Sequence, residues 1–334
     1  MTEVEDAARR LDAAASARAL PALARLRATV GPVPDAATLR RFLTRDVPQV
    51  VGPGPTEPHE VAWAVAEAFE RAGRPDLAEV ARSPQTHVGV ARGRWVASFP
   101  GIPTGFWEPV LDLADLAPPG APPRAALSLV AATALLQVVG DGVELTADGL
   151  LPLETVRGLD DRFRWTDDFP WMRVRDETDI APLSLLRQHL MAQELLRRDG
   201  RRLVPTTTGT AVSQDTGRLW DAIVDPGPRW PGRFERDALA VMAASVLRSV
   251  DYAADRVAGQ MAHVLATKWR PGHQASGGGG RLAGLTALAQ TWYRLGVPLG
   301  WWDTGRGPAD RRPNSFGRAA AVTVFRIVAG RPEG

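Results

Sequence analysis

The dipeptide Asp199-Gly200 is the feature that most restricts how this chain can fold. It stands between two short apolar pairs, Leu195-Leu196 and Leu203-Val204, and an Asp-Gly pair between apolar strands is a strong signal for a β-hairpin. The stretch before it has apolar side chains at helical spacing, namely Leu183, Leu186 and Leu190. The segment from Ala181 to Asp225 is therefore predicted to contain a helix, a hairpin and a second helix, in that order.

A similar pattern recurs later in the sequence. Leu299 to Asp303 is predicted to form one strand, residues 304–310 the tip, and a helix is expected from Ser315 onward. In both LVPTTTGTAV (203–212) and RRPNSFGRAA (311–320), a hydroxyl residue stands two or three positions before a glycine that opens a helix. Trp301 and Trp302 are expected to alternate across the strand, so that one of them points outward. A hairpin "wing" that follows two helices is the pattern of a winged helix, which the sequence predicts twice.

The remaining segments predict a largely helical protein. Residues 4–28 predict one helix, and Asp35 is expected to cap another over 36–44. THVGVARGRWVASF (86–99) resembles a hairpin that turns near residues 91–93, and APPGAPP (117–123) and PGPRWP (226–231) mark boundaries. We predict a mainly α fold with three parts: a helical N-terminal domain over 1–117 with a short hairpin near 86–99, a winged-helix-like module over 124–225, and a second winged-helix-like module with a small β-hairpin over 233–331.

Composition narrows the class of protein. With 334 residues, 45% hydrophobic and 23% charged, the chain resembles an ordinary soluble protein of two or three domains. The absence of Cys excludes disulfides, thiolate chemistry and cysteine zinc sites. No apolar run approaches the roughly 20 residues that a membrane span needs, and the start of the sequence is acidic and amphipathic and lacks an apolar signal core. A cytoplasmic protein without membrane contact is therefore expected.

One stretch of the sequence resembles a known family. Residues 143–159 read VELTADGLLPLETVRGL, and they are followed by ETDIAPLSLLRQHLMAQELLRRDGRRLVPTTTGTAV (177–212) and by the pair Leu219-Trp220. An LT-x-x-G-x-L element, then a helix and an rLvpt-x-x-G wing, resembles an actinobacterial family found as the C-terminal part of plasmid pRiA4b ORF-3-like proteins. The similarity extends over roughly 125–330, although Leu151 and Pro152 stand where the pattern prefers a polar residue. The resemblance implies winged-helix-like modules with no established activity, so it assigns no functional residues.

The charge distribution indicates where a polyanion could bind. Residues 231–334 carry 14 basic and 7 acidic side chains, a net of +7, whereas 1–120 and 121–230 have nets of −2 and −3. A local basic patch is sufficient for phosphate contacts. The candidate nucleic-acid-binding side chains are Arg281, Gln290, Arg294, Arg306, Arg311 and Arg312 around the second hairpin, and Arg197, Arg198, Arg201 and Arg202 around the first. The helix before the first hairpin also offers Arg187, Gln188, His189 and Gln193.

The two hairpins are not equivalent candidates. Asp176, Glu177 and Asp179 lie just upstream of the first hairpin and are expected to repel phosphates, so there we favour a solvated tip that is rich in Arg through composition alone. At the second hairpin, the basic surroundings make nucleic-acid binding and a merely solvated tip equally well supported.

No catalytic residue, metal site or cofactor is assigned from the sequence. SGGGG (276–280) before Arg281 fits G-x-G-x-x-A, but no buried strand precedes it and no GKS or GKT follows, so a flexible loop is predicted. The acidic pairs Asp160-Asp161 and Asp167-Asp168 have adjacent side chains that point in different directions, which favours a solvated face over a Mg²⁺ or hydrolytic site. The five His residues lack metal-ligand spacing.

We therefore expect a non-catalytic binding or scaffold protein that contacts nucleic acid, duplex DNA included, through its basic C-terminal module. The alternative is a protein–protein adaptor, or a self-associating subunit of a larger assembly, with no nucleic-acid contact. An enzyme ranks third. Binding of nucleic acid would weaken steeply with salt, whereas an adaptor would co-purify with its partner.

Overall fold

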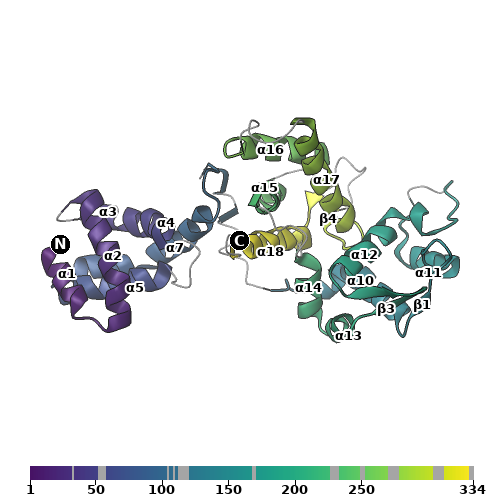
Figure 1. The fold of residues 1–334 in the computed structure, drawn as a ribbon, viewed down its shortest axis with the longest axis horizontal. Coiled ribbons are helices and arrows are strands. Elements are labelled where there is room, and N and C mark those ends of the chain that lie inside the picture. The colour runs from purple at the N-terminus through teal and green to yellow at the C-terminus, as the bar shows by residue number, and fades with distance from the viewer. Residues whose placement is uncertain are drawn as a thin grey trace. The chain divides into compact units, whose positions relative to one another are not determined.

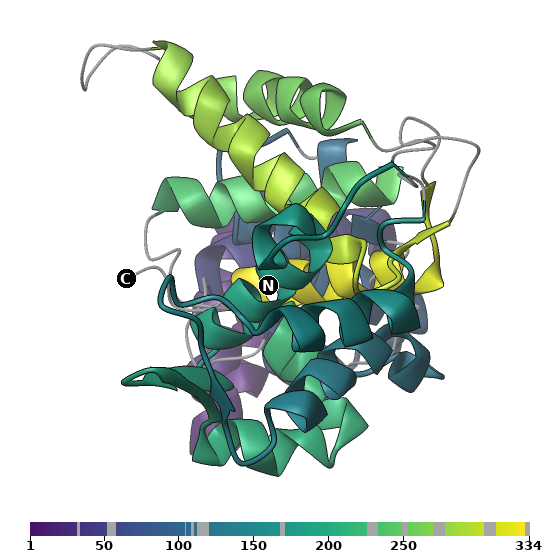
Figure 2. The same cartoon turned by 90° about the vertical axis from the view of Figure 1, so that its right-hand side faces the viewer.

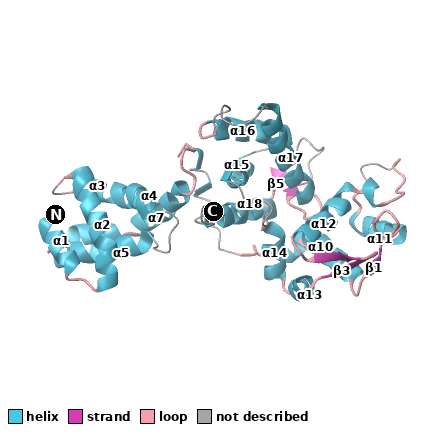
Figure 3. Ribbon diagram, viewed as in Figure 1, coloured by secondary structure: helices cyan, strands magenta, loops and turns pink. Residues whose placement is uncertain are grey.

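The computed structural model of the chain describes residues 1–31, 34–51, 58–103, 105–107, 110–111, 120–167, 171–225, 233–248, 253–269, 278–303 and 312–330. These residues are mainly helical and include two small antiparallel sheets, which confirms the predicted mainly α class (Figures 1 and 3). The chain divides into two compact units, one of Met1–Trp107 with Ala329–Gly334 and one of Glu108–Val328. None of the helices described has the length and apolarity to cross a bilayer.

The first unit packs its helices around one apolar core. Its elements are α1 (Thr2–Arg9), α2 (Ala13–Val30), α3 (Ala36–Arg41), the π-helical turn η1 (Phe42–Asp46), α4 (Val47–Val51), α5 (Pro58–Arg71), α6 (Pro75–Arg82) and α7 (Pro84–Ala97). Large buried side chains such as Leu26, Phe42 and Phe69 meet small ones such as Ala62 and Ala66 of α5, which lets the helices approach closely.

Capping carboxylates set the helix boundaries at the start of the chain. The single helix predicted over 4–28 is wrong, because the Asp12 carboxylate accepts a hydrogen bond of 2.8 Å from the Ala15 N–H and begins α2 anew after α1 has ended at Arg9. The predicted cap at Asp35 is confirmed by its bond of 2.7 Å from the Thr38 N–H. That backbone hydrogen bond holds the pKa of Asp35 below its usual value.

The hairpin predicted near 86–99 is also wrong, since residues 84–97 form the continuous helix α7. Ser83 caps this helix by accepting a hydrogen bond from Thr86, and Pro84 occupies its first turn. Gly89 and Gly93 lie against η1, where an added Cβ at Gly93 would come within 2.0 Å of the Thr44 carbonyl oxygen. The glycines therefore serve helix packing, which a periodicity argument cannot distinguish from a turn.

The second unit begins with short helices around a three-stranded sheet and continues with longer helices. Its elements are α9 (Ala125–Ser128), α10 (Val130–Val139), β1 (Val143–Glu144), α11 (Leu153–Phe163), the 3-10 turn η2 (Glu177–Asp179), α12 (Ala181–Ala192), β2 (Leu196–Asp199), β3 (Arg202–Pro205), α13 (Thr207–Ser213), α14 (Thr216–Val224), α15 (Arg233–Arg248), α16 (Ala254–Ala266), α17 (Gly278–Gly296), β4 (Trp302–Asp303), β5 (Arg312–Pro313) and α18 (Ser315–Gly330). Helix α15 is buried along most of its length, and α12 packs against α17. The glycine run predicted as a loop is helical from Gly278, and its earlier part lies outside the described residues.

The two hairpins predicted around Asp199-Gly200 and after Leu299 are present. In the first sheet the strand order is β1-β3-β2, all antiparallel, with Asp199 paired to Arg202 next to the turn. The β2–β3 ribbon projects from the body of the second unit (Figure 2). In the second sheet, Trp302 pairs with Pro313 and Asp303 with Arg312. The tip predicted over 304–310 lies outside the described residues.

Candidate nucleic-acid interface

The β2–β3 ribbon carries its arginines on a scaffold anchored by leucines. Leu196 and Leu203 are buried, and they attach the two strands to the core of the second unit. Gly200 adopts φ of 60°, which an Asp-Gly hairpin turn requires and which costs glycine little. Because side chains alternate along a strand, anchoring one face of the ribbon leaves the other face to solvent.

All four arginines of this ribbon are exposed, but their surroundings differ. Arg197 forms an ion pair of 3.5 Å with the Asp199 carboxylate, and Arg198 donates from Nε to the Gly200 carbonyl at 2.8 Å. Arg202 donates to the carbonyl oxygens of residues 141 and 142 at 3.3 and 3.2 Å. For the Arg201 side chain, no hydrogen bond or ion pair to another described residue exists. The ribbon therefore holds four cations, and those bonded to the protein are bonded weakly enough to exchange for phosphate.

A polar groove runs beside this ribbon. It has a volume of about 440 Å³ and lies between the ribbon, the end of α10 and helix α13. Its walls include Gln137, Asp141, Arg197, Thr210 and Gln214. Amide and hydroxyl groups together with one guanidinium suit hydrogen bonding to phosphate and sugar oxygens, whereas the carboxylates of Asp141 and Asp199 oppose an anion there.

Helix α12 uses most of the polar side chains that the sequence offered as nucleic-acid contacts for bonds within the protein. Arg187 is buried and donates from Nε to the Glu177 carboxylate at 2.6 Å. His189 Nε2 lies 2.7 Å from the Ile223 carbonyl oxygen, and the Gln193 amide donates to the Asp225 carbonyl oxygen. Only Gln188 of this set is exposed. The predicted base-contacting role is wrong for Arg187, because its guanidinium is already used in the interior.

The acidic segment before α12 is satisfied within the protein. Glu177 is fully buried against Arg187, and it also accepts a hydrogen bond of 2.9 Å from the Leu151 N–H. Asp179 accepts hydrogen bonds from Arg175, which hold the pKa of this carboxyl below its ordinary value. Asp176 caps η2 through the Thr178 N–H. Two of the three carboxylates are thus partnered by arginines, and the repulsion of phosphates expected from this segment is correspondingly weaker.

The second ribbon exposes fewer of its predicted residues within the part of the chain that is described. Arg294 at the end of α17 and Arg312 on β5 are exposed, and Gln290 is half-buried. Arg306 and Arg311 lie outside the described residues, as does the side chain of Arg281. The expectation that Trp301 or Trp302 points outward is wrong, since both are buried. Trp301 packs on Trp292 with ring centroids 4.8 Å apart, and Trp302 donates from Nε1 to the Tyr293 carbonyl at 2.9 Å.

One surface feature was missed from the sequence. Three apolar side chains on α9 and α10 are exposed, Leu127 at 64%, Val130 at 37% and Val138 at 43%. Val130 also lines a groove of about 250 Å³ that continues along α10 to Gln137 and is lined as well by Gln214 at the end of α13. Helix α10 is apolar on nearly all sides, a pattern usually explained by burial, so its sequence could not distinguish the covered face from the open one.

Comparison with known proteins identifies one related domain. Residues 125–218 match the sequence model of the Y4jL N-terminal domain family. The match covers α9 through α13, including all three strands of the first sheet, and ends in α14. No curated protein and no solved structure shows significant similarity to the chain. The matched segment thus coincides with the part that carries the arginine ribbon, and the family's description states no activity.

Proposed function

We propose that the chain is a non-catalytic nucleic-acid-binding protein, and that residues 125–218 form a winged-helix module whose wing is the β2–β3 ribbon. Support comes from the order α10, β1, α11, α12, β2, β3 and from the strand order β1-β3-β2. The observation that carries the proposal is the set of four exposed arginines on one projecting ribbon, with Arg201 free of partners among the described residues. The similarity to plasmid pRiA4b ORF-3-like proteins remains part of this proposal.

The proposed binding is largely independent of base sequence. Arg187, His189 and Gln193 of α12 are bonded inside the protein, and α17 packs against this helix. A helix held in this way cannot enter a major groove as a recognition helix does. The ribbon arginines are then left to contact phosphates, which position a protein on a duplex without reading its sequence. The basic C-terminal module supplies a second contact, through Arg294 and Arg312 and the segment 304–311.

A salt titration tests this proposal. In fluorescence anisotropy with a labelled duplex, the four ribbon arginines should contribute about −3.6 to the slope of log affinity against log salt if all of them contact phosphates, which is roughly a 100-fold loss of affinity between 50 and 200 mM salt. Replacing Arg197, Arg198, Arg201 and Arg202 with Ala should remove most of that slope. Replacing Arg306, Arg311 and Arg312 with Ala measures the share of the C-terminal module separately.

The control must separate a specific contact from a change in net charge. Arg201→Ala should reduce the slope by about 0.9. Arg218→Ala removes one exposed arginine of α14, which pairs with Asp215 at 3.7 Å, and should leave the slope unchanged. Equal losses in both variants, or no binding at 50 mM salt, would count against the ribbon as the contact.

A second candidate function is favoured by the exposed apolar residues of α9 and α10. A protein partner would bind over Leu127, Val130 and Val138, and the chain would then act as an adaptor subunit. Leu127→Asp with Val138→Asp should abolish co-purification of a partner while leaving duplex affinity unchanged. If the double variant instead weakens duplex binding and still co-purifies with the same proteins, the adaptor hypothesis is wrong.

A further inference from the structure

Two grooves of the second unit adjoin along helix α10. One, of about 440 Å³, lies beside the β2–β3 ribbon, and the other, of about 250 Å³, extends toward α9 and α11. They share three wall residues, Gln137 on α10 and Ser213 and Gln214 at the end of α13. Helix α10 packs against α11, α13 and β3, which appear beside it in Figure 1. The two grooves therefore form one path, which we call the α10 groove.

Each half of the α10 groove has one arginine in its wall. In the half beside the ribbon, Arg197 pairs with Asp199 at 3.5 Å. In the other half, Arg162 of α11 is exposed, and its guanidinium carbon lies over the Phe163 ring, 5.3 Å from the ring centroid. Phe163 stacks in turn on Trp165, with ring centroids 4.9 Å apart. The rings hold the Arg162 guanidinium in place, while no hydrogen bond or ion pair to another described residue uses its N–H donors.

The two shared amides of the α10 groove are also unused. The side chains of Gln137 and Gln214 are exposed, and neither has a hydrogen bond to another described residue. Each amide offers two N–H donors and one acceptor oxygen. They can therefore bond to a molecule in the groove without losing a bond inside the protein.

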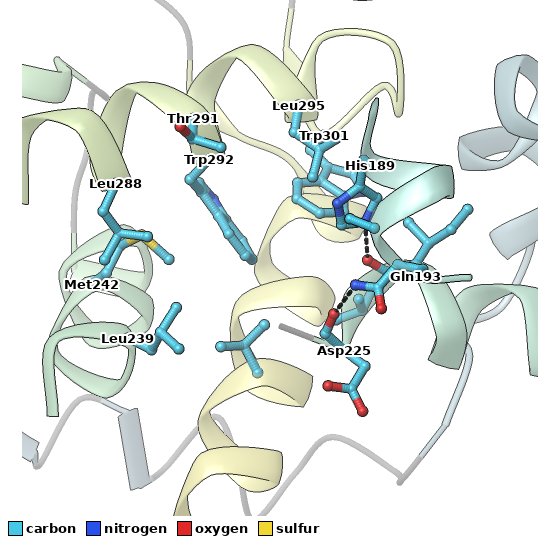
Figure 4. A pocket seen from close by; sticks show the side chains of 14 residues that line it. His189, Gln193, Asp225, Leu239, Met242, Leu288, Thr291, Trp292, Leu295 and Trp301 are labelled. Atoms are coloured by element: carbon cyan, nitrogen blue, oxygen red, sulfur yellow. Dashed lines mark hydrogen bonds between the residues drawn. The ribbon is translucent and has the colours of Figure 1, made fainter. Parts of the chain in front are cut away.

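Polar side chains around another hollow of this unit are bonded within the protein instead. In the cavity of about 140 Å³ beside Trp292, His189 Nε2 lies 2.7 Å from the Ile223 carbonyl oxygen (Figure 4). The Gln193 amide of the same wall donates to the Asp225 carbonyl oxygen. The open donors of the α10 groove are thus a feature of that groove and not of every hollow in the unit.

Charge and chemistry favour an unpaired nucleic-acid strand as the occupant. A strand has a phosphate at every nucleotide, so it can place one anion at Arg162 while a later nucleotide reaches the ribbon. Its base edges carry the donors and acceptors that amides match, whereas the bases of a duplex are paired and stacked and cannot turn into the groove. The Asp141 and Asp199 carboxylates oppose phosphate only in the ribbon half, where Asp199 is paired with Arg197.

We propose that the α10 groove binds a single nucleic-acid strand, with Arg162 and Arg197 on phosphates and Gln137 and Gln214 on base edges. The inference rests on the proposed function, and it names the form of nucleic acid that the ribbon's module prefers. The chain should therefore bind an unpaired strand more tightly than the duplex of the same sequence.

Fluorescence anisotropy of the full chain compares a labelled strand of about twelve thymidines, within the length that one single-strand site covers, with its duplex with oligo-dA. Arg162→Ala should weaken strand binding roughly five- to tenfold at 50 mM salt and reduce the salt slope by about 0.7, the value of one phosphate contact. Gln137→Glu keeps the side-chain shape but turns a negative charge toward the strand, so it should weaken binding to a similar extent. Neither substitution should change duplex affinity.

Arg164→Ala and Gln188→Glu are the matched controls. Arg164 is exposed, lines neither half of the groove and pairs with Asp167 at 2.9 Å. Gln188 is exposed on α12 and also lines neither half. Both controls repeat the change in net charge away from the groove and should leave strand affinity as it is.

The proposal is overturned, with the proposed function intact, if the duplex binds as tightly as the strand. Strand affinity that survives both Arg162→Ala and Gln137→Glu, or that falls equally in the controls, places the strand elsewhere on the protein. Displacement of the strand by poly-glutamate as readily as by unlabelled strand would assign the groove to an acidic peptide. If neither strand nor duplex binds, the proposed function fails as well.

Discussion

The β2–β3 and β4–β5 ribbons enter their sheets through the same backbone geometry. Each follows a residue in the left-handed region, Glu194 with φ of 55° and Gly300 with φ of 60°. The next residue, Leu195 or Trp301, donates its N–H at 2.9 Å to the carbonyl five positions earlier, at the end of the preceding helix. Both ribbons therefore begin directly after the same type of helix C-terminus.

The ribbons also end alike. The N–H of Thr206 donates to the Leu195 carbonyl at 3.0 Å, and that of Asn314 donates to the Trp301 carbonyl at the same distance. Each of these residues then caps the next helix, Thr206 through the N–H of residue 209 and Asn314 through the N–H groups of residues 316 and 317. The approximate sequence repeat therefore corresponds to a repeated backbone geometry, in which the caps are the hydroxyl of Thr206 and the side-chain amide of Asn314.

What differs is the chemistry that holds each ribbon's preceding helix. In the first, α12 is attached by the buried Arg187–Glu177 ion pair. In the second, the matching position is Tyr293, whose ring lies 5.6 Å from that of Trp302. The comparison teaches that one backbone design tolerates either a charged or an aromatic interior contact.

The largest expected effect is on the charged contact. Arg187→Met leaves Glu177 buried without its cation and should lower the free energy of unfolding by about 3–5 kcal/mol. Urea denaturation followed by circular dichroism measures this. Adding Glu177→Gln to Arg187→Met should recover part of the loss, because no uncompensated charge then remains. If Arg187→Met alone is as stable as the unaltered chain, the ion pair does not hold α12 in place.

The next largest effect concerns the glycines after each cap. An added Cβ at Gly209 would lie 2.0 Å from the Leu195 carbonyl oxygen, and one at Gly317 would lie 2.4 Å from that of Trp301. Gly209→Ala and Gly317→Ala should each destabilise by about 2–3 kcal/mol, since backbone must move. Gly158→Ala, in a helix with nothing within 4 Å, should be neutral or mildly stabilising. The common design would be refuted if only one ribbon responded.

The caps should contribute less. Thr206→Ala and Asn314→Ala each remove a side-chain acceptor at a helix N-terminus and should cost about 1 kcal/mol in thermal or urea unfolding. Thr206→Ser and Asn314→Asp preserve an acceptor and should be nearly neutral. A cost confined to Thr206→Ala would mean that α18 does not depend on its cap as α13 does.

The smallest expected change in stability comes from substitutions at the left-handed residue before each ribbon, and it should have opposite signs in the two ribbons. Glu194→Gly relieves a left-handed conformation that a side chain disfavours and should stabilise by about 0.5–1 kcal/mol. Gly300→Ala should destabilise by a similar amount. Thermal unfolding of both variants checks the pair, and a change of the same sign in both would contradict the shared entry geometry.

Local chemistry of the sequence was sufficient to predict the hairpin at Asp199-Gly200, the cap at Asp35 and the mainly α class. These depend on residues within a few positions of one another, whose backbone preferences act whatever the rest of the chain does. Alternation along the strands also places Arg197 and Arg202 on the face opposite the buried leucines, whereas Arg198, which pairs with Leu203, and Arg201 are exposed next to the turn at the end of the ribbon.

The packing of the helices and the burial of particular side chains were decided by tertiary contacts. Within helix α7, Gly89 and Gly93 pack closely against Thr44 of a distant segment, and the Arg187 side chain points inward because it pairs with the buried Glu177. Trp301 and Trp302 are both buried because α17 covers them, and the cavity beside Trp292 exists only where several helices converge. Such features depend on which segments meet across long sequence separations, and no local pattern encodes that meeting.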